Sequence, residues 1–192
     1  MLDENQITGK QLVENQKKMA DRLLGINQNA PLGYSVSAFV GILHRCGSLP
    51  PVALYDVGRC VEILVNEEGV DPEEAMDIFC YTSLRAMRYA GDNAEAFIHF
   101  DCDDEACYED LEILDEFEDG FLGLVEHSGS HLGAVGYDKT KCLEIILQRD
   151  EISENDAEIQ LQSIMTCNKN EHAPTFIELV SGYDIRWMTE RN

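Results

Sequence analysis

The chain of 192 residues carries 37 Asp and Glu against 14 Lys and Arg, which gives a formal net charge of −23 at pH 7. So few bases exclude direct binding to a nucleic-acid backbone or an anionic membrane, because such contacts need Lys and Arg. The charge favours solubility or a basic partner. A hydrophobic content of 44% is enough to build the core of one or two domains.

The N-terminal region, residues 1–34, is predicted to be a helix followed by a loop. Residues 8–24 are amphipathic, with Thr8 as a suitable N-cap and Leu12, Met19 and Leu23 along one stripe. The start of the chain lacks the apolar run of a signal peptide, and no stretch approaches the ~20 apolar residues of a membrane span. We therefore expect a cytoplasmic protein, inside a host cell.

A repeat organises the rest of the chain. Residues 39–75 align with residues 121–157 without a gap, so that Tyr55-Asp56 matches Tyr137-Asp138 and Cys60 matches Cys142. Such self-similarity indicates a repeated structural unit. The predicted divisions are repeat 1 at 35–100, an acidic connecting segment at 101–118, repeat 2 at 119–180, and a C-terminal tail at 181–192 that carries Trp187.

Each repeat is predicted to contain five elements. Repeat 1 begins with a helix that starts at Ser35 or Ser37 and ends at Gly47, and then forms a strand at Val52–Tyr55. Asp56 and Asp71 are good N-caps for two further helices, at 57–67 and from Asp71 to about 89, before a strand at 96–100. The elements predicted for repeat 2 are a helix at 119–128, a strand at 134–137, helices at 139–149 and 154–167, and a strand at 174–179. Asp138, which matches Asp56, is the predicted N-cap of the helix at 139–149.

The predicted fold class is therefore α+β, with two tandem helix–strand–helix–helix–strand repeats. Two strands alone make a marginal sheet. We expect the two copies to share one small antiparallel or mixed sheet of four strands with pseudo-two-fold symmetry, as in an isologous dimer. A linear, side-by-side arrangement of the repeats is the alternative.

The connecting segment concentrates negative charge. From Tyr89 to Asp138 there is no Lys or Arg, while fifteen Asp or Glu fall in that stretch. One interpretation is a solvated helix face and linker; the other is an electronegative surface that a basic partner recognises. On the second interpretation, the candidate partner-binding residues are Asp101, Asp103, Asp104, Glu105, Glu109, Asp110, Glu112, Asp115, Glu116, Glu118 and Asp119.

No catalytic residue, metal site or cofactor is predicted. The equivalent thiols of Cys60 and Cys142 lie beside apolar stripes and are expected to be buried and reduced rather than nucleophilic. His99, Cys102 and Cys107, with His127 and His131 further on, include zinc-ligand types, but their spacing matches none of the usual paired motifs. Gly-rich phosphate loops and the common hydrolase motifs are missing from the sequence.

The repeat resembles a family of small uncharacterised bacteriophage proteins. The similarity lies in YDVGRCVEIL (55–64) with EEA (73–75), and in YDKTKCLEII (137–146) with PTF (174–176). Proteins of that family carry one such unit, so this chain is similar to a tandem duplication of it. The resemblance covers most of residues 36–180 and implies a viral origin, without a known activity.

We therefore expect a non-enzymatic, phage-encoded interaction protein that inhibits or modulates a host protein. Its partner would be a basic surface of a host or phage protein, and in the sharpest form the acids mimic DNA and occupy a nucleic-acid cleft, as anti-defence proteins do. Two alternatives stay open. One is a small-molecule- or metal-binding enzyme with its site between the repeats, and the other is a virion or scaffold component.

Overall fold

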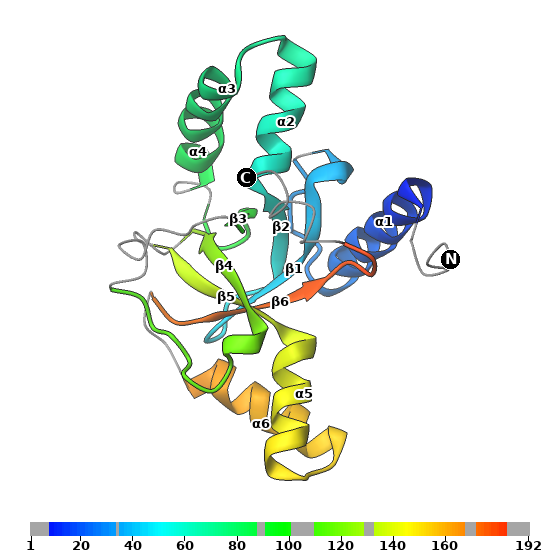
Figure 1. Ribbon diagram of the computed structural model, residues 1–192, viewed down its shortest axis with the longest axis vertical. Helices are drawn as coiled ribbons and strands as arrows, with labels where there is room; N and C mark the ends of the chain where they lie inside the picture. Colours follow the sequence, from blue (N-terminus) through cyan, green and yellow to red (C-terminus); the bar gives the residue numbers. More distant parts are fainter. Residues whose placement is uncertain are drawn as a thin grey trace, which may run out of the picture.

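A computed structural model of the chain describes residues 8–33, 35–87, 91–100, 110–128, 133–167 and 172–183. Six strands close into a barrel in the order β1-β2-β3-β4-β5-β6 (Figure 1). The strands are β1 (Phe39–Arg45), β2 (Val52–Asp56), β3 (Ala96–His99), β4 (Phe121–Glu126), β5 (Ala134–Asp138) and β6 (Thr175–Leu179).

Each repeat contributes three consecutive strands with the same pairing. In repeat 1, β1 is antiparallel to β2, and β2 is parallel to β3; β4, β5 and β6 repeat this pattern. Two antiparallel seams, β3/β4 and β1/β6, join the repeats and close the barrel. The registers also correspond, because Phe39 pairs with Tyr55 as Phe121 pairs with Tyr137, and a register shift follows each pair. The barrel is therefore pseudo-two-fold in its pairing.

The predicted unit of helix–strand–helix–helix–strand is wrong, and so is the sheet of four strands. Residues predicted as the first helix of each repeat form a short 3-10 turn and then a strand, namely η1 (Val36–Ala38) with β1 and η4 (Glu118–Gly120) with β4. The linear alternative fails as well, because all six strands belong to one barrel. The α+β class itself is retained.

The misassignment of β1 has a physical cause. Phe39 and Ile42 pack outward against helices, while Val40 and Leu43 pack into the barrel. A strand buried on both faces has a continuous apolar sequence, and periodicity does not separate such a run from a buried helix. Gly47, predicted to end a helix, instead adopts a positive φ of 85° in the β1–β2 connection, and its N–H donates to the carbonyl of Met165 at 2.8 Å.

The other predicted helices are confirmed within a few residues at their ends. They are α1 (Gly9–Ile26), α2 (Val57–Glu68), α5 (Lys139–Asp150) and α6 (Glu154–Cys167), while the third helix of repeat 1 consists of α3 (Pro72–Phe79), a π-helical turn η2 (Cys80–Leu84) and α4 (Arg85–Met87). Because parallel strands need a crossover, α2 to α4 connect β2 with β3, and α5 and α6 connect β5 with β6. Figure 1 shows these two helical layers on opposite sides of the barrel, with α1 beside it.

The core has three parts. Apolar side chains from five strands fill the barrel: Val40, Leu43, Val52, Leu54, Ala96, Ile98, Val125 and Ile177. On the outside, Tyr55 and Phe97 pack under α1, α2 and α3, and Tyr137 and Phe176 pack under α5 and α6. The equivalent strand positions Leu54 and Gly136 differ greatly in size, and a Cβ at Gly136 would lie only 2.7 Å from Val125. The interior is therefore packed without room for a larger residue there.

Asp56 and Asp138 occupy the N-cap positions of α2 and α5, as predicted. Asp138 Oδ1 accepts hydrogen bonds from the backbone N–H groups of Thr140 and Lys141, at 2.8 and 3.3 Å. Asp56 is buried; it accepts from the Arg59 N–H at 3.2 Å and from the Tyr183 hydroxyl at 2.6 Å. Burial raises the pKa of the Asp56 carboxyl even though these groups donate to it. The two aspartates thus share a role, and Asp56 has an additional one.

The two caps are expected to differ in their contribution to stability. Asp138→Ala should lower the free energy of unfolding by about 1 kcal/mol, the typical value of an N-cap. Asp56→Ala should cost about 2 kcal/mol or more, because it also removes the acceptor of the half-buried Tyr183 hydroxyl. Urea unfolding of both variants measures the difference, with Asp56→Asn as the control that keeps an acceptor. Equal losses in the two alanine variants would contradict this assignment.

Candidate functional site

Six of the predicted partner-binding acids lie in the described part of the acidic segment (residues 101–119). Five of them are exposed, namely Asp110, Asp115, Glu116, Glu118 and Asp119, and Glu112 is half-buried. The remaining candidates lie outside the described residues: Asp101, Asp103, Asp104, Glu105 and Glu109. The described acids therefore present most of their carboxylates to solvent.

Residues 110–117 are fixed against repeat 2 by their apolar side chains. Phe117 is buried with the residues under α5 and α6, and Leu111 and Leu114 pack against the same cluster. The backbone N–H of Leu114 donates to the hydroxyl of Tyr137 at 2.8 Å. The stretch contains no regular helix before η4. The acids around Phe117 are thus displayed from an anchored segment, which a solvated linker would not require.

Lys141 of α5 interacts electrostatically with Asp119, and Arg149 of the same helix contacts the described part of this segment directly. Its guanidinium pairs with Glu116 and also with Asp150, at 2.7 Å from Nε to Oδ1 in the second case. These two carboxylates raise the pKa of Arg149, the hydrogen bond to Asp150 being the larger influence. Glu116 is therefore partly compensated within the protein and is a weaker candidate for partner binding than its exposed neighbours.

A second group of exposed acids lies at the tip formed by α2 and α3. Sequence reasoning did not select it, because acids at a helix start are already explained by capping and by the helix dipole. Asp71 does cap α3, since its Oδ1 accepts from the N–H groups of Glu73 and Glu74 at 3.0 Å each. The exposed members of this group are Glu67, Glu68, Asp71, Glu73, Glu74 and Asp77.

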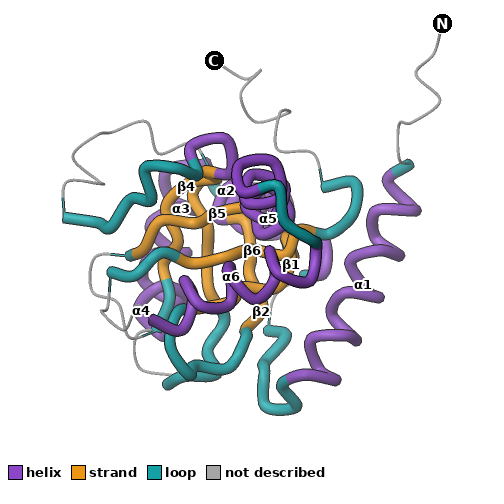
Figure 2. The backbone as a smooth tube through the Cα atoms, turned by 90° about the horizontal axis from the view of Figure 1, so that it is seen from below, coloured by secondary structure: helices purple, strands orange, loops and turns teal. Residues whose placement is uncertain are grey.

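The outer surfaces of β1 and β4 are equivalent in pairing but differ in exposure. Phe39, on β1, is 1% exposed and packs in the cluster that includes Ala20 and Leu23 of α1. Phe121, at the matching place on β4, is 41% exposed. Ile42 is fully buried, whereas its counterpart Leu124 is half-exposed. Figure 2 shows α1 along one side of the barrel and β4 on the other side.

Both seams also carry a carboxylate beside an imidazole, with the residue types exchanged. At the β1/β6 seam, Glu178 Oε2 lies 3.5 Å from His44 Nε2, and at the β3/β4 seam Glu126 Oε1 lies 3.0 Å from His99 Nε2. The pairing registers make His44 the counterpart of Glu126 and Glu178 the counterpart of His99. Comparison of the two repeats in the sequence missed this exchange, because each of the two positions has a histidine in one repeat and a glutamate in the other.

A further residue, Arg22 of α1, binds Glu178 through both guanidinium nitrogens, at 2.7 Å from Nη2 to Oε2. Burial opposes ionisation of Glu178, but the hydrogen bond and charge of Arg22 hold its pKa below the usual value. Burial lowers the pKa of His44, and the positive charge of Lys139 acts in the same direction. The β1/β6 seam is therefore a site where a carboxylate already binds a cation supplied by a helix.

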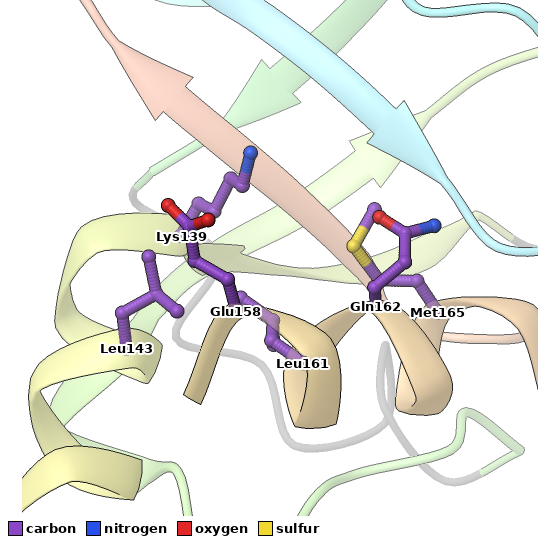
Figure 3. A pocket seen from close by; sticks show the side chains of 6 residues that line it. All are labelled: Lys139, Leu143, Glu158, Leu161, Gln162 and Met165. Carbon is purple, nitrogen blue, oxygen red and sulfur yellow. The ribbon is translucent and has the colours of Figure 1, made fainter. Parts of the chain in front are cut away.

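A small groove lies between α5 and α6, with a volume of about 160 Å³ (Figure 3). It is lined by Lys139, Leu143, Glu158, Leu161, Gln162 and Met165. In repeat 1 the position of Leu161 is taken by Phe79, whose ring is buried against Phe97 at 5.1 Å between centroids. The side chain at this position is therefore smaller in repeat 2 than in repeat 1. The volume of the groove is below the roughly 300 Å³ at which small-molecule pockets begin.

The thiols of Cys60 and Cys142 and the imidazole of His127 are buried in the described part of the chain. Cys60 and Cys142 are buried, as predicted, and burial raises the pKa of each thiol to about 12. His127 is buried with its Nδ1 2.8 Å from the Ser128 carbonyl. Within the described ranges no three His, Cys, Asp or Glu side chains converge as metal ligands. Cys102, Cys107 and His131 lie outside those ranges.

The barrel interior is one of the places where the two repeats meet. Leu43, Leu54 and Ile98 fill it together with other aliphatic side chains from both repeats. Binding pockets need convergent polar groups in a concave space, and the interior of the described barrel offers aliphatic atoms instead. The groove in Figure 3 lies within repeat 2, not between the repeats.

None of the helices in the described residues combines the length and the apolar character that crossing a bilayer requires. The tail with Trp187 lies outside the described residues. Comparison of the chain with protein-family models, with curated proteins and with solved structures found no match in any of the three. The resemblance to bacteriophage proteins therefore stays a prediction.

Proposed function

We propose that the protein is a non-enzymatic acidic interaction protein that binds a basic surface of a partner protein. The observation that carries this proposal is the anchored acidic segment, in which Leu111, Leu114 and Phe117 pack on repeat 2 while Asp115, Glu118 and Asp119 stay exposed. Fixing like charges close together raises their mutual repulsion, so solubility alone does not call for it. A basic partner would relieve that repulsion.

The resemblance to bacteriophage proteins suggests a viral origin, and a host or phage protein as partner, with inhibition of it, is part of the same proposal. Mimicry of DNA is its narrower form, which requires the acids of residues 101–119 to line one elongated face. Partner binding through exposed carboxylates should weaken steeply with salt, because exposed charges are screened over about 10 Å at 0.1 M ionic strength.

The test is capture of partners from a bacterial lysate on the immobilised full chain, at about 0.05 M and about 0.5 M salt. Neutralising Asp110, Asp115, Glu118 and Asp119 to Asn or Gln should abolish the salt-sensitive capture and leave the circular dichroism spectrum unchanged. The matched control neutralises Glu67, Glu68, Glu73 and Glu74 at the α2–α3 tip, which changes the net charge equally. Equal capture by both variants and the unaltered chain would mean that the acidity of residues 110–119 only keeps the protein soluble.

A further inference from the structure

Helix α1 shows how the outer surface of this barrel binds a helix. From one face of α1, the Gln16 side-chain amide donates to the carbonyl oxygen of Phe39 at 2.9 Å, and Arg22 pairs with Glu178. Ala20 and Leu23, on the same face, are buried in the cluster that contains Phe39. The binding pattern is therefore an amide donor, a small residue, a cation and a leucine at relative positions 0, 4, 6 and 7 along the helix.

We define the β4 face by the residues Glu118, Asp119, Phe121, Leu124 and Glu126. Strand β4 repeats the backbone pairing of β1 on the other side of the barrel. Phe121 and Leu124 stand where β1 has Phe39 and Ile42. The β3/β4 seam supplies a carboxylate and an imidazole again. The described residues place no second helix over this face as α1 lies over β1 (Figures 1 and 2).

The rim of the β4 face is more acidic than that of its counterpart. Glu118 and Asp119 in η4 occupy the positions that Val36 and Ser37 hold in η1, the turn against which α1 packs. A helix bound at this face would therefore meet two additional carboxylates beside an apolar stripe. Such a surface is complementary to a helix that is apolar on one side and carries several bases.

We propose that the β4 face binds an amphipathic, basic helix of the partner protein, in the position that α1 holds on β1. This inference rests on the proposed function and assigns its binding mode. A second copy of the chain is a poor occupant, because each copy carries a net charge of −23 and like-charged surfaces repel. Exposed Phe121 supplies the apolar anchor, and Glu118, Asp119 and Glu126 select for positive charge.

The probe is a fluorescently labelled synthetic peptide with the sequence of residues 8–27, TGKQLVENQKKMADRLLGIN, which has four bases and two acids. Its binding to the full chain is measured by fluorescence anisotropy. Phe121→Ser should weaken binding at least about tenfold, as expected for a central anchor, while Ile159→Ser, at a 61% exposed position on α6, should not. Glu118→Gln with Asp119→Asn should weaken binding and flatten its salt dependence, whereas Glu73→Gln with Glu74→Gln should not.

The circular dichroism spectrum and the unfolding midpoint of each variant establish that the fold is retained. Absence of peptide binding, or equal binding to the Phe121→Ser and unaltered chains, would overturn the inference. Self-association that Phe121→Ser abolishes would also overturn it, by making a second copy the occupant. If lysate capture depends on Asp110, Asp115, Glu118 and Asp119 but not on Phe121, the binding mode fails and the proposed function stands. If capture depends on Phe121 but not on those acids, the acidic function fails instead.

Discussion

Replacing Gly41 or Gly123 by alanine is expected to destabilise the barrel by about 3 kcal/mol or more in each case. A Cβ at Gly41 would overlap the backbone carbonyl of Glu178, and a Cβ at Gly123 would overlap that of His99. Backbone atoms of a paired strand cannot rotate away as a side chain can, so each seam would have to open. Gly123 also has a φ of 145°, which L-residues rarely adopt.

Chemical denaturation of the two variants measures this effect, with Gly25→Ala as the control. Gly25 lies in α1, and nothing lies within 4 Å of a Cβ built there. That substitution should stabilise the protein by about 0.5–1 kcal/mol through helix propensity. The total stability of a domain is about 5–15 kcal/mol, so either seam variant should show a large shift in midpoint. A loss below about 1 kcal/mol would show that the strands separate easily there.

Phe97→Ala is expected to cost about 3–5 kcal/mol, the range for removing a buried aromatic side chain. Phe97 is buried on β3 between the aromatic rings of Phe79 and Tyr55, at centroid distances of 5.1 and 6.2 Å. Removing its ring leaves a cavity beneath α2 and α3, which cannot collapse without moving the barrel strands. The expected result is a variant that is folded only marginally at room temperature.

Two further variants make this prediction specific. Phe97→Leu fills most of the volume and should recover more than half of the lost stability. Phe121→Ala, at the exposed position on β4, should change the free energy of unfolding far less than Phe97→Ala. Thermal unfolding followed by circular dichroism compares the three. Similar losses for Phe97→Ala and Phe121→Ala would contradict the packing described here, because they would place both rings in equivalent surroundings.

The gapless repeat was a reliable guide to local structure. Asp56, Asp71 and Asp138 cap helices where predicted, and Gly69 ends α2 in the left-handed conformation. These features were predictable because a cap depends on a side chain and on backbone groups two or three residues away. The burial of Cys60 and Cys142 was likewise predictable, since both lie beside apolar helix stripes.

The acidity of residues 101–119 was readable from the sequence, but their anchoring was not. Leu111, Leu114 and Phe117 recur every third residue, as on a helix face, yet this stretch forms no regular helix and they meet α5 and α6 only in the folded chain. The exposure of Phe121 was hidden as well, because its repeat partner Phe39 has the same residue type and is buried. Whether a repeated aromatic is core or surface depends on α1, which packs on one copy only.

The sequence by itself determined the repeat, the helix caps, the negative charge, the four strands β2, β3, β5 and β6, and the helices that connect them in pairs. Only the tertiary structure decided that residues 39–45 and 121–126 are strands and that the six strands close into a barrel. The physical reason is that short-range rules govern turns and caps, whereas a strand is stabilised by partners distant in the chain. Glu178 beside Gly41, and Glu126 beside His99, become neighbours only when both seams form.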